Sequence, residues 1–429
     1  MPILRFLRWN PLNAGIVGLM SCVSLPACAQ QGLTWDQIKA KFEAVNPVLK
    51  ADSLNVDEMH AEEITANLRP NPQLTVSQDG TQIVPNSGIW QPLKGTYVVP
   101  TLSYLHERDH KRELRLESAK EGTRIAASSH EDLQRNLEFN LRSAFVNTLE
   151  AKAILELAKA DLDYYDKIIA ISRDRFKAGD LAQIDLDRIE LLRVQYEVEI
   201  QSAIVNLRTA KIQLLQMLDD RTPVEQFDVT GPFDFSEVLG PLEDFRQIAL
   251  STRPDLQAAL QTIQQSQTNH KLAISNGSTD PTFSGWYTYN SSNNNPNGTQ
   301  TLGASVSIPL RIFDRNQGEK QRTLIDIDRS RQASEAVRAQ VFSDVDSAYA
   351  QVQSNIALLK PYKTQYMDQA LRVRDTVTFA YEHGGASLMD FLNAQSDYRT
   401  VQLAYTQLIG AYLTAAGQLN LAVGREVIQ

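Results

Sequence analysis

A five-residue segment has the spacing of a metal-dependent peptidase site. His106-Glu107-Arg108-Asp109-His110 reads H-E-x-x-H, a pattern in which two histidines one helical turn apart bind zinc and the glutamate acts as general base. The two intervening residues are charged here, whereas the helix that carries this motif in zinc peptidases is buried. No third ligand stands in a suitable frame among the remaining histidines, His60, His130, His270 and His383. We therefore interpret the segment as a polar junction between a strand and a helix, with zinc metallopeptidase as the alternative.

No other catalytic or cofactor-binding pattern is evident. The sequence contains no G-x-x-x-x-G-K, no G-x-G-x-x-G and no G-x-S-x-G, the patterns of phosphate-binding loops, dinucleotide sites and hydrolase nucleophiles. We expect neither enzymatic activity nor a cofactor. The net charge of −9 and the pI near 5.3 argue against a nucleic-acid partner, because nucleic-acid-binding proteins present basic surfaces.

The first residues have the pattern of a secretory signal peptide. Arg5 and Arg8 form a basic segment, residues 14–23 form a short apolar stretch, and Ala27-Cys28-Ala29 offers a small-x-small cleavage site. This pattern predicts a signal peptide over residues 1–29. The alternative is a lipoprotein signal that leaves Cys28 as an acylated first residue. Because the other cysteine, Cys22, lies within the signal, we expect no disulfide in the mature chain.

Three short motifs in the first half of the chain recur in the same order in the second half, between 205 and 209 residues later. Such self-similarity is the sign of an internal duplication. We predict two structural repeats, residues 30–230 and 231–429, each built as a helix, a β-hairpin and two long helices. The paired motifs are Asn46-Pro47-Val48-Leu49 with Arg253-Pro254-Asp255-Leu256, Asn71-Pro72-Gln73-Leu74 with Asp280-Pro281-Thr282-Phe283, and Phe176-Lys177-Ala178-Gly179 with Tyr381-Glu382-His383-Gly384.

Four segments alternate in the manner of membrane strands. In the clearest one, every even-numbered residue from Leu302 to Ile308 is apolar, and the odd-numbered residues are serine, threonine or glycine. Alternation of apolar with small polar residues is typical of barrel strands that face lipid on one side and water on the other. The predicted strands are 73–77, 95–103, 282–289 and 301–308, with a polar turn cluster at 291–299. The alternative is a pair of soluble hairpins on a helical protein.

Long helices are predicted in both halves. Residues 111–178 contain no proline, and residues 320–381 contain only Pro361. A helix of some 65 residues is about 100 Å long, and Gly179 and Gly384 are expected to end these helices. Apolar residues recur every three or four positions, which predicts antiparallel coiled-coil packing. The predicted contact positions are Val337, Val341, Val345, Ala348, Val352, Ile356 and Leu359 on one helix and Val401, Ala404, Leu408, Ala411, Ala415, Leu419 and Ala422 on the next.

Four strands are too few to close a barrel. An open sheet edge in lipid leaves unpaired backbone groups that each cost several kcal/mol, and the smallest membrane barrels have about eight strands. The missing strands must therefore come from other copies of the chain. We predict a mainly α protein with a membrane β part, in which three chains form a long α-barrel joined to a 12-stranded β-barrel.

These features resemble the TolC-type outer-membrane factors, also called outer membrane efflux proteins. The resemblance rests on the duplicated halves, on Arg253-Pro254-Asp255-Leu256, and on residues 307–319, which read Ser-Ile-Pro-Leu-Arg-Ile-Phe-Asp-Arg-Asn-Gln-Gly-Glu. The last stretch looks most like the heavy-metal (CzcC-like) branch. The resemblance implies a homotrimer in the lipid of the bacterial outer membrane with a long periplasmic extension. It also implies two partners, a periplasmic adaptor and an inner-membrane pump of the RND type.

The resemblance also implies positions for the periplasmic entrance. The family carries an aspartate six residues after the second helix-turn glycine and another three later, and these positions are Asp390 and Asn393 here. The closed state in the family uses a tyrosine and an aspartate that correspond to Tyr381 and Asp185. Its arginine corresponds to Ala386 in this chain, so the latch differs in detail. The alternative for Asp185 and Asp390 is a helix-start charge that favours the helix dipole.

The exposed helix turns are expected to dock the adaptor. These turns comprise Gly179, Asp180 and Leu181 in the first half and Gly384, Gly385 and Ala386 in the second. Taken together, the sequence predicts a passive outer-membrane duct of a tripartite system that exports metal ions or small toxic compounds. The alternative within the same fold is the outer component of type I protein secretion, because a fold alone does not determine the cargo.

Overall fold

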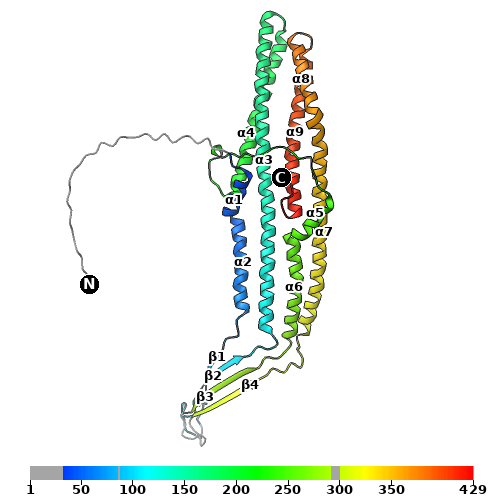
Figure 1. Cartoon of the computed structure of the whole chain (residues 1–429). Helices are drawn as coiled ribbons and strands as arrows, with labels where there is room; N and C mark the ends of the chain where they lie inside the picture. Colours follow the sequence, from blue (N-terminus) through cyan, green and yellow to red (C-terminus); the bar gives the residue numbers. More distant parts are fainter. Residues whose placement is uncertain (1–31, 86, 291–299, 429) are drawn as a thin grey trace, which may run out of the picture.

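The protein is an elongated, mainly helical rod with a small sheet at one end (Figure 1). The computed structural model describes residues 32–85, 87–290 and 300–428. The predicted signal peptide, including Cys28 and its proposed acylation, lies outside the described residues, as does the turn cluster at 291–299. Among the described residues, no helix is both long enough and apolar enough to cross a membrane.

The elements follow one another in the order helices, hairpin, helices, twice along the chain. In the first half they are α1 (Trp35–Val45), α2 (Pro47–Ala66), β1 (Gln73–Asp79), β2 (Tyr97–Leu105), α3 (Lys111–Ala178) and α4 (Gln183–Met217). A 3-10 turn (Val224–Gln226) and an extended linker lead to α5 (Leu242–Thr252), α6 (Pro254–Ser275), β3 (Thr282–Asn290), β4 (Gln300–Ser307), α7 (Gln317–Pro361), a π-helical turn (Tyr362–Tyr366), α8 (Met367–Glu382) and α9 (Leu388–Val423).

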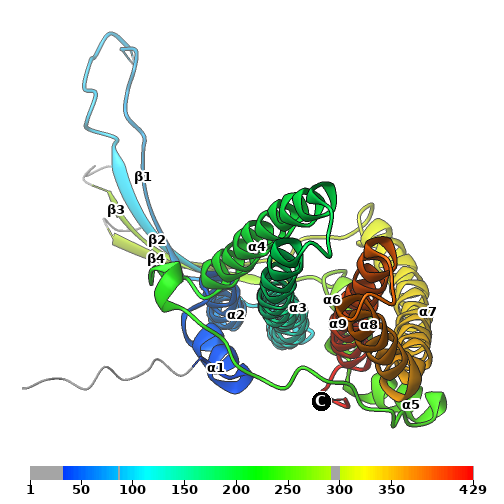
Figure 2. The ribbon, with the colours of Figure 1, turned by 90° about the horizontal axis from the view of Figure 1, so that it is seen from above.

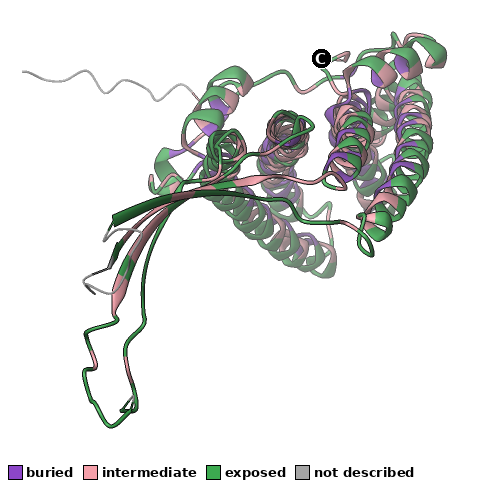
Figure 3. Cartoon of the chain, turned by 90° about the horizontal axis from the view of Figure 1, so that it is seen from below, coloured by how far each residue is buried: buried purple, intermediate pink, exposed green. Residues whose placement is uncertain are grey.

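The four strands form one antiparallel sheet in the order β1-β2-β3-β4. The predicted strands are therefore present, with all their ends shifted by two residues or fewer. The sheet projects away from the helices, and neither of its faces is covered by a helix (Figure 3). Within the described chain, the outer edges of β1 and β4 have no strand partner.

The register of the sheet collects apolar side chains on one face. Leu74 pairs with Leu102, Leu102 with Gly285, and Gly285 with Ala304, and directly paired residues lie on the same face. The opposite face carries serine and threonine together with Trp286, whose ring covers Gly303. A Cβ at position 303 would lie 2.3 Å from Cε2 of Trp286, so only glycine fits beside this ring.

The second long helix is not continuous, which corrects the expectation of one helix over 320–381. Pro361 ends α7, and residues Tyr362–Tyr366 adopt a π-helical turn before α8 begins. Proline has no N–H, and its ring clashes with the carbonyl one turn earlier. The chain accommodates this by widening the next turn, as π-bulges do. By contrast, α3 runs without interruption over Lys111–Ala178, as predicted.

The contact between α7 and α9 is largely as predicted. All seven predicted positions on α7 lie in one apolar cluster, in which Val341, Val345 and Val352 are fully buried. On α9, Ala415, Leu419 and Ala422 are buried in the same cluster. Ala411 is exposed instead, because Tyr412 and Leu413 take the buried positions of that turn. Tyr412 reaches the linker, where its hydroxyl accepts a hydrogen bond of 3.3 Å from the Ser236 amide.

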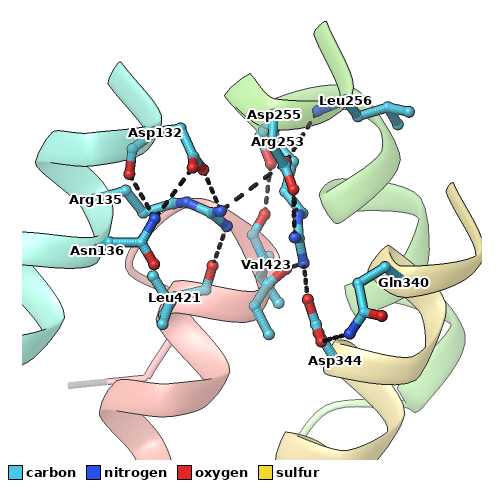
Figure 4. Close-up of polar contacts among 12 residues, drawn as sticks. Asp132, Arg135, Asn136, Arg253, Asp255, Leu256, Gln340, Asp344, Leu421 and Val423 are labelled. Carbon is cyan, nitrogen blue, oxygen red and sulfur yellow. Dashed lines mark hydrogen bonds and ion pairs between the residues drawn. The ribbon is translucent and has the colours of Figure 1, made fainter. Parts of the chain in front are cut away.

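A buried arginine joins three helices at the middle of the rod. Arg253, at the start of α6, is 4% exposed, and its guanidinium contacts Asp255 on the same helix and Asp344 on α7 at 2.6 and 2.8 Å (Figure 4). It also donates to the carbonyl of Ala422 on α9, at 3.2 Å. The last carbonyls of a helix have no partner within the helix, so Arg253 satisfies one of them while neutralising two carboxylates.

Two neighbouring groups bind the same helix end. Arg135 of α3 donates to the Leu421 carbonyl at 2.6 Å and pairs with Asp132 on its own helix. The Thr252 hydroxyl donates to the Val423 carbonyl, also at 2.6 Å. The end of α9 is therefore held by α3, by α6 and by the last residue of α5. We call this group, Arg135, Thr252, Arg253, Asp255 and Asp344, the waist network.

We expect Arg253→Met to destabilise the protein by about 3–5 kcal/mol, because it leaves two carboxylates and a helix-end carbonyl without their buried partner. The free energy of unfolding of the detergent-solubilised protein, measured by denaturant titration, checks this. Arg331→Met is the control, since Arg331 forms only an exposed pair with Asp328, and such pairs contribute at most about 1 kcal/mol. Equal losses in the two variants would contradict the role assigned to the waist network.

Candidate functional site at the helix tips

Two sharp turns form the end of the rod opposite the sheet (Figure 1). Gly179 after α3 and Gly384 after α8 have φ of +87° and +74°, and the space where a Cβ would stand is open at both. The amides of Asp180 and Gly385 donate to the carbonyls of Arg175 and Ala380, at 2.9 and 2.7 Å. These are the hydrogen bonds of the Schellman motif, which requires a left-handed residue and so favours glycine.

The tip residues differ in exposure. Gly179, Asp180, Gly384 and Gly385 are exposed, whereas Leu181 and Ala386 are half-buried. Ala386 packs against an apolar cluster beneath the tips that contains Tyr165, Ile189 and Phe391. This cluster draws residues from both helical hairpins, α3–α4 and α8–α9, so it fixes the position of one tip relative to the other.

Asp390 lies in the first turn of α9, where it forms a capping box. Its Oδ2 accepts from the Ser387 amide at 3.2 Å and from the Ser387 hydroxyl at 2.7 Å, while its own amide donates to Ser387 Oγ. The hydrogen bonds from Ser387 lower the pKa of the Asp390 carboxyl, which therefore stays charged at neutral pH. The predicted partner Asn393 lies one turn further along the same helix and is also exposed.

Asp185 occupies the equivalent position in the first turn of α4 but has a different setting. The residue before this helix is Ala182, which has no side-chain oxygen for capping. Asp185 is half-buried, and the structure does not bring it to Tyr381 within the described chain. The macrodipole explanation accounts for the placement of both aspartates, and the gate roles of Asp185, Asp390, Asn393 and Tyr381 remain predictions.

Tyr381 joins the two hairpins through residues that the sequence did not single out. Its ring is buried and stacks on Phe391 at 5.0 Å. Arg175 of α3 lies over this ring at 4.9 Å and donates to the Tyr381 carbonyl at 2.7 Å. An arginine in the last turn of α3 thus caps the end of α8. The expected arginine position, Ala386, carries no such group, and Arg175 supplies the cation from the other hairpin.

Further contacts join the hairpins below Tyr381. The Tyr164 hydroxyl of α3 lies 2.9 Å from the Thr378 hydroxyl of α8, and Arg399 of α9 pairs with Glu199 of α4 at 2.8 Å. Both hairpins contribute to each contact, so separating the hairpins would break all of them together. We call these three contacts, Arg175–Tyr381, Tyr164–Thr378 and Arg399–Glu199, the tip seam.

The H-E-x-x-H segment lies at the other end of α3 and does not have the geometry of a zinc site. Residues 106–109 are not helical, and His110 precedes α3 with a φ of +59°. The two histidines therefore do not share one helix face. Glu107 pairs with Arg115, with one of its contacts at 3.0 Å. Among the described residues, no group of three His, Cys, Asp or Glu side chains could hold a metal ion.

The arrangement of the chain matches that of solved outer-membrane channels. The structure of CusC superposes with a TM-score of 0.77 at 18% identity, covering 91% of this chain and 92% of that one. The outer-membrane channel OprN gives 0.74 at 15% identity, covering 91% and 89%. The CmeC outer membrane channel of Campylobacter jejuni gives 0.75 at 15% identity, covering 92% and 87%. This chain therefore has the fold of those channel proteins.

The sequence comparisons point to the same family. Residues 245–425 match the family model of the outer membrane efflux proteins. The cobalt-zinc-cadmium resistance protein CzcC of Cupriavidus metallidurans is 21% identical over 390 residues, covering 88% of this chain and 86% of the relative. Over residues 245–425 the chain thus matches the outer membrane efflux proteins, in agreement with its resemblance to the TolC-type factors. These likenesses agree with the expected location in the outer membrane with a periplasmic extension.

We expect Arg175→Met to loosen the second tip, because the variant loses both the cap on the Tyr381 carbonyl and the cation over its ring. Together these contribute about 1–3 kcal/mol. Amide hydrogen exchange at residues 379–387 should become at least several-fold faster. Arg173→Met is the matched control, since among the described residues Arg173 forms an ion pair with Glu190 alone, within the first hairpin. Unchanged exchange in Arg175→Met would refute the capping role.

Proposed function

We propose that three copies of this chain form a passive channel that exports metal cations from the periplasm across the outer membrane. In this proposal a periplasmic adaptor docks on the exposed tips around Gly179 and Gly384, and an inner-membrane pump supplies the cargo. The channel itself catalyses no reaction.

The observation that carries the proposal is the uncovered four-stranded sheet. Its two outer edges have no partner in the described chain, and its apolar face includes Leu74, Leu302 and Val306, which are more than half exposed. In lipid the apolar face has suitable surroundings, but the backbone N–H and C=O groups of the open edges have no hydrogen-bond partner. Pairing β1 of one copy with β4 of the next satisfies both edges at once. Three copies then give twelve strands, which leaves room for an aqueous lumen.

Helix α4 supports the same assembly from the helical part. Along this helix, Ile189, Tyr196, Ala203 and Ala210 recur every seven residues and are all buried against the rest of the chain. A second apolar row with the same spacing lies on another face and is 49% to 73% exposed; it consists of Ile184, Leu191, Val198, Val205 and Ile212. A seven-residue apolar row is a coiled-coil seam, so the second row fits a helix of a neighbouring copy.

We expect the detergent-extracted protein to be a trimer of about 140 kDa, three chains of 48.0 kDa less their signal peptides, as closure of the sheet requires. Val198→Glu should weaken the trimer, because it places a charge in the exposed row of α4. Light scattering corrected for bound detergent measures the mass. Ile204→Glu is the matched control, since Ile204 is exposed on the same helix outside both rows. A stable wild-type monomer would overturn the proposal.

The proposed cargo class follows from the charges at the tips. Asp390 is exposed and charged in the first turn of α9, and three copies around a narrow entrance would hold three like charges close together. Such a ring attracts cations and repels anions. The likeness to CzcC, whose name states cobalt, zinc and cadmium resistance, supports metal ions as the cargo.

In a planar bilayer we expect a cation-selective pore that multivalent cations block from the periplasmic side. Asp390→Asn should weaken this block at least several-fold. The amide keeps an oxygen for the Ser387 contacts, so the helix start survives while the charge is lost. Asn393→Asp should strengthen the block by adding a second charged ring. If Asp390→Asn leaves selectivity and block unchanged, Asp390 acts only as a helix cap.

A further inference from the structure

A carboxyl group is buried between the helical hairpins, below the tips. Asp161 of α3 is 6% exposed, and within the described chain its carboxylate has neither a hydrogen-bond donor nor an ion-pair partner within 4 Å. It lines a cavity of about 290 Å³ together with Glu199, Ser202, Asn206 and Arg399. A buried carboxylate without partners is costly in its charged form, so this group needs either a proton or better hydration.

The charged and titratable groups that face Asp161 come from every helix packed around it. Helix α4 contributes Glu199, helix α8 contributes Arg374, and helix α9 contributes Arg399. Arg399 is already paired with Glu199 and lies over the Tyr196 ring at 5.0 Å. Arg374 is paired with Asp375 and lies over the rings of Tyr164 and Tyr398. Both arginines are therefore occupied by other partners and leave Asp161 only long-range attraction.

The electrostatic balance at Asp161 stabilises the neutral acid more than it would be stabilised in an exposed aspartate. Burial raises the pKa of the Asp161 carboxyl to about 6, because the attraction of Arg399 and Arg374 only partly offsets the loss of water, and Glu199 adds repulsion. The carboxyl therefore changes its charge within the range of pH that an outer-membrane protein meets.

The position of Asp161 connects this titration to the tip seam. Two residues of the seam are close to Asp161. Arg399 of α9 faces it, and Tyr164 lies one helical turn further along α3. When the hairpins are packed, Asp161 is buried. When they separate, water reaches the carboxylate through the opened cavity.

We propose that Asp161 is a proton-binding site that controls the packing of the two hairpins, with the protonated acid holding the tip seam closed and the carboxylate favouring its opening. The link to channel opening rests on the function proposed above. The effect on packing does not, because it concerns a single chain.

The direction follows from proton linkage. A carboxyl whose pKa is higher in the packed state than the usual value of about 3.9 binds a proton more tightly there. Lowering the pH through 6 therefore stabilises the packed state, and this gain is complete below about pH 4. With these two pKa values, the ratio of open to packed hairpins should fall about tenfold between pH 7.5 and pH 5.0.

The first test compares the melting temperatures of detergent-solubilised wild type and Asp161→Asn at several pH values. Asn cannot ionise, so the variant should melt higher than wild type at pH 7.5, and the difference should shrink as the pH falls and vanish below about pH 4. Asp163→Asn is the control, because Asp163 lies two residues away on the exposed face of α3, and it should follow wild type throughout. A difference between Asp161→Asn and wild type that does not depend on pH overturns the proposal.

The second test measures open probability in a planar bilayer. The wild type and Asp163→Asn should open about tenfold less at pH 5.0 than at pH 7.5, whereas Asp161→Asn should stay at the low value at both. A pH-dependent stability difference combined with pH-independent opening would overturn the coupling to the tips. If the chain forms no channel, the function proposed above fails, and the melting experiment still decides whether Asp161 binds the proton.

Discussion

The pairing of the last carbonyls of α9 at the waist network is the interaction on which the arrangement of the helices depends. Arg253, Arg135 and Thr252 come from three different segments and all donate to this one helix end. A buried helix end has no water to bind its last carbonyls, and each of these donors supplies the missing hydrogen bond. Because Arg253 also binds Asp344 of α7, the network fixes α9 relative to its neighbours and so sets the direction in which both hairpins project toward the tips.

The same requirement explains the two ends of the rod. At the tips, Arg175 caps the end of α8, and the left-handed glycines direct the turn amides back to the helices. At the sheet, the outer edges of β1 and β4 have backbone groups with no partner in the described chain. Three regions are thus governed by one rule, that buried or lipid-facing backbone groups must be paired. Two of them satisfy it within the chain, and the sheet would do so in the proposed trimer by pairing with neighbouring copies.

Local patterns in the sequence predicted the elements well, because alternation and three-four spacing are local properties. The strands, the extent of α3 and the α7 contact row at Val341, Val345 and Val352 were all recognisable. The proline at position 361 was evident in the sequence. The sequence did not show that the helix would continue through a π turn there, because that depends on packing. The sequence did not reveal the contacts of Arg253 or Arg175. Arg253 stood out only as part of a repeated motif, and Arg175 did not stand out. Their partners, Ala422 and Tyr381, lie more than 160 residues away in the sequence. The H-E-x-x-H spacing misled in the opposite direction, since a pattern of five residues does not establish that the segment is helical.

The two long helices that reach the tips differ in stiffness. Helix α3 has an unbroken ladder of hydrogen bonds over Lys111–Ala178, whereas the path through α7 and α8 contains the π turn at Tyr362–Tyr366. A wider turn with one backbone donor missing resists bending less than a regular one. The rod therefore consists of one rigid helix, α3, beside a helical path through α7 and α8 that can bend at its π turn. A sideways force applied at the tips would be transmitted by the first to the sheet, and would be absorbed by the second at its joint, which lies 16 residues of helix α8 from the tip and 45 residues of helix α7 from the sheet end.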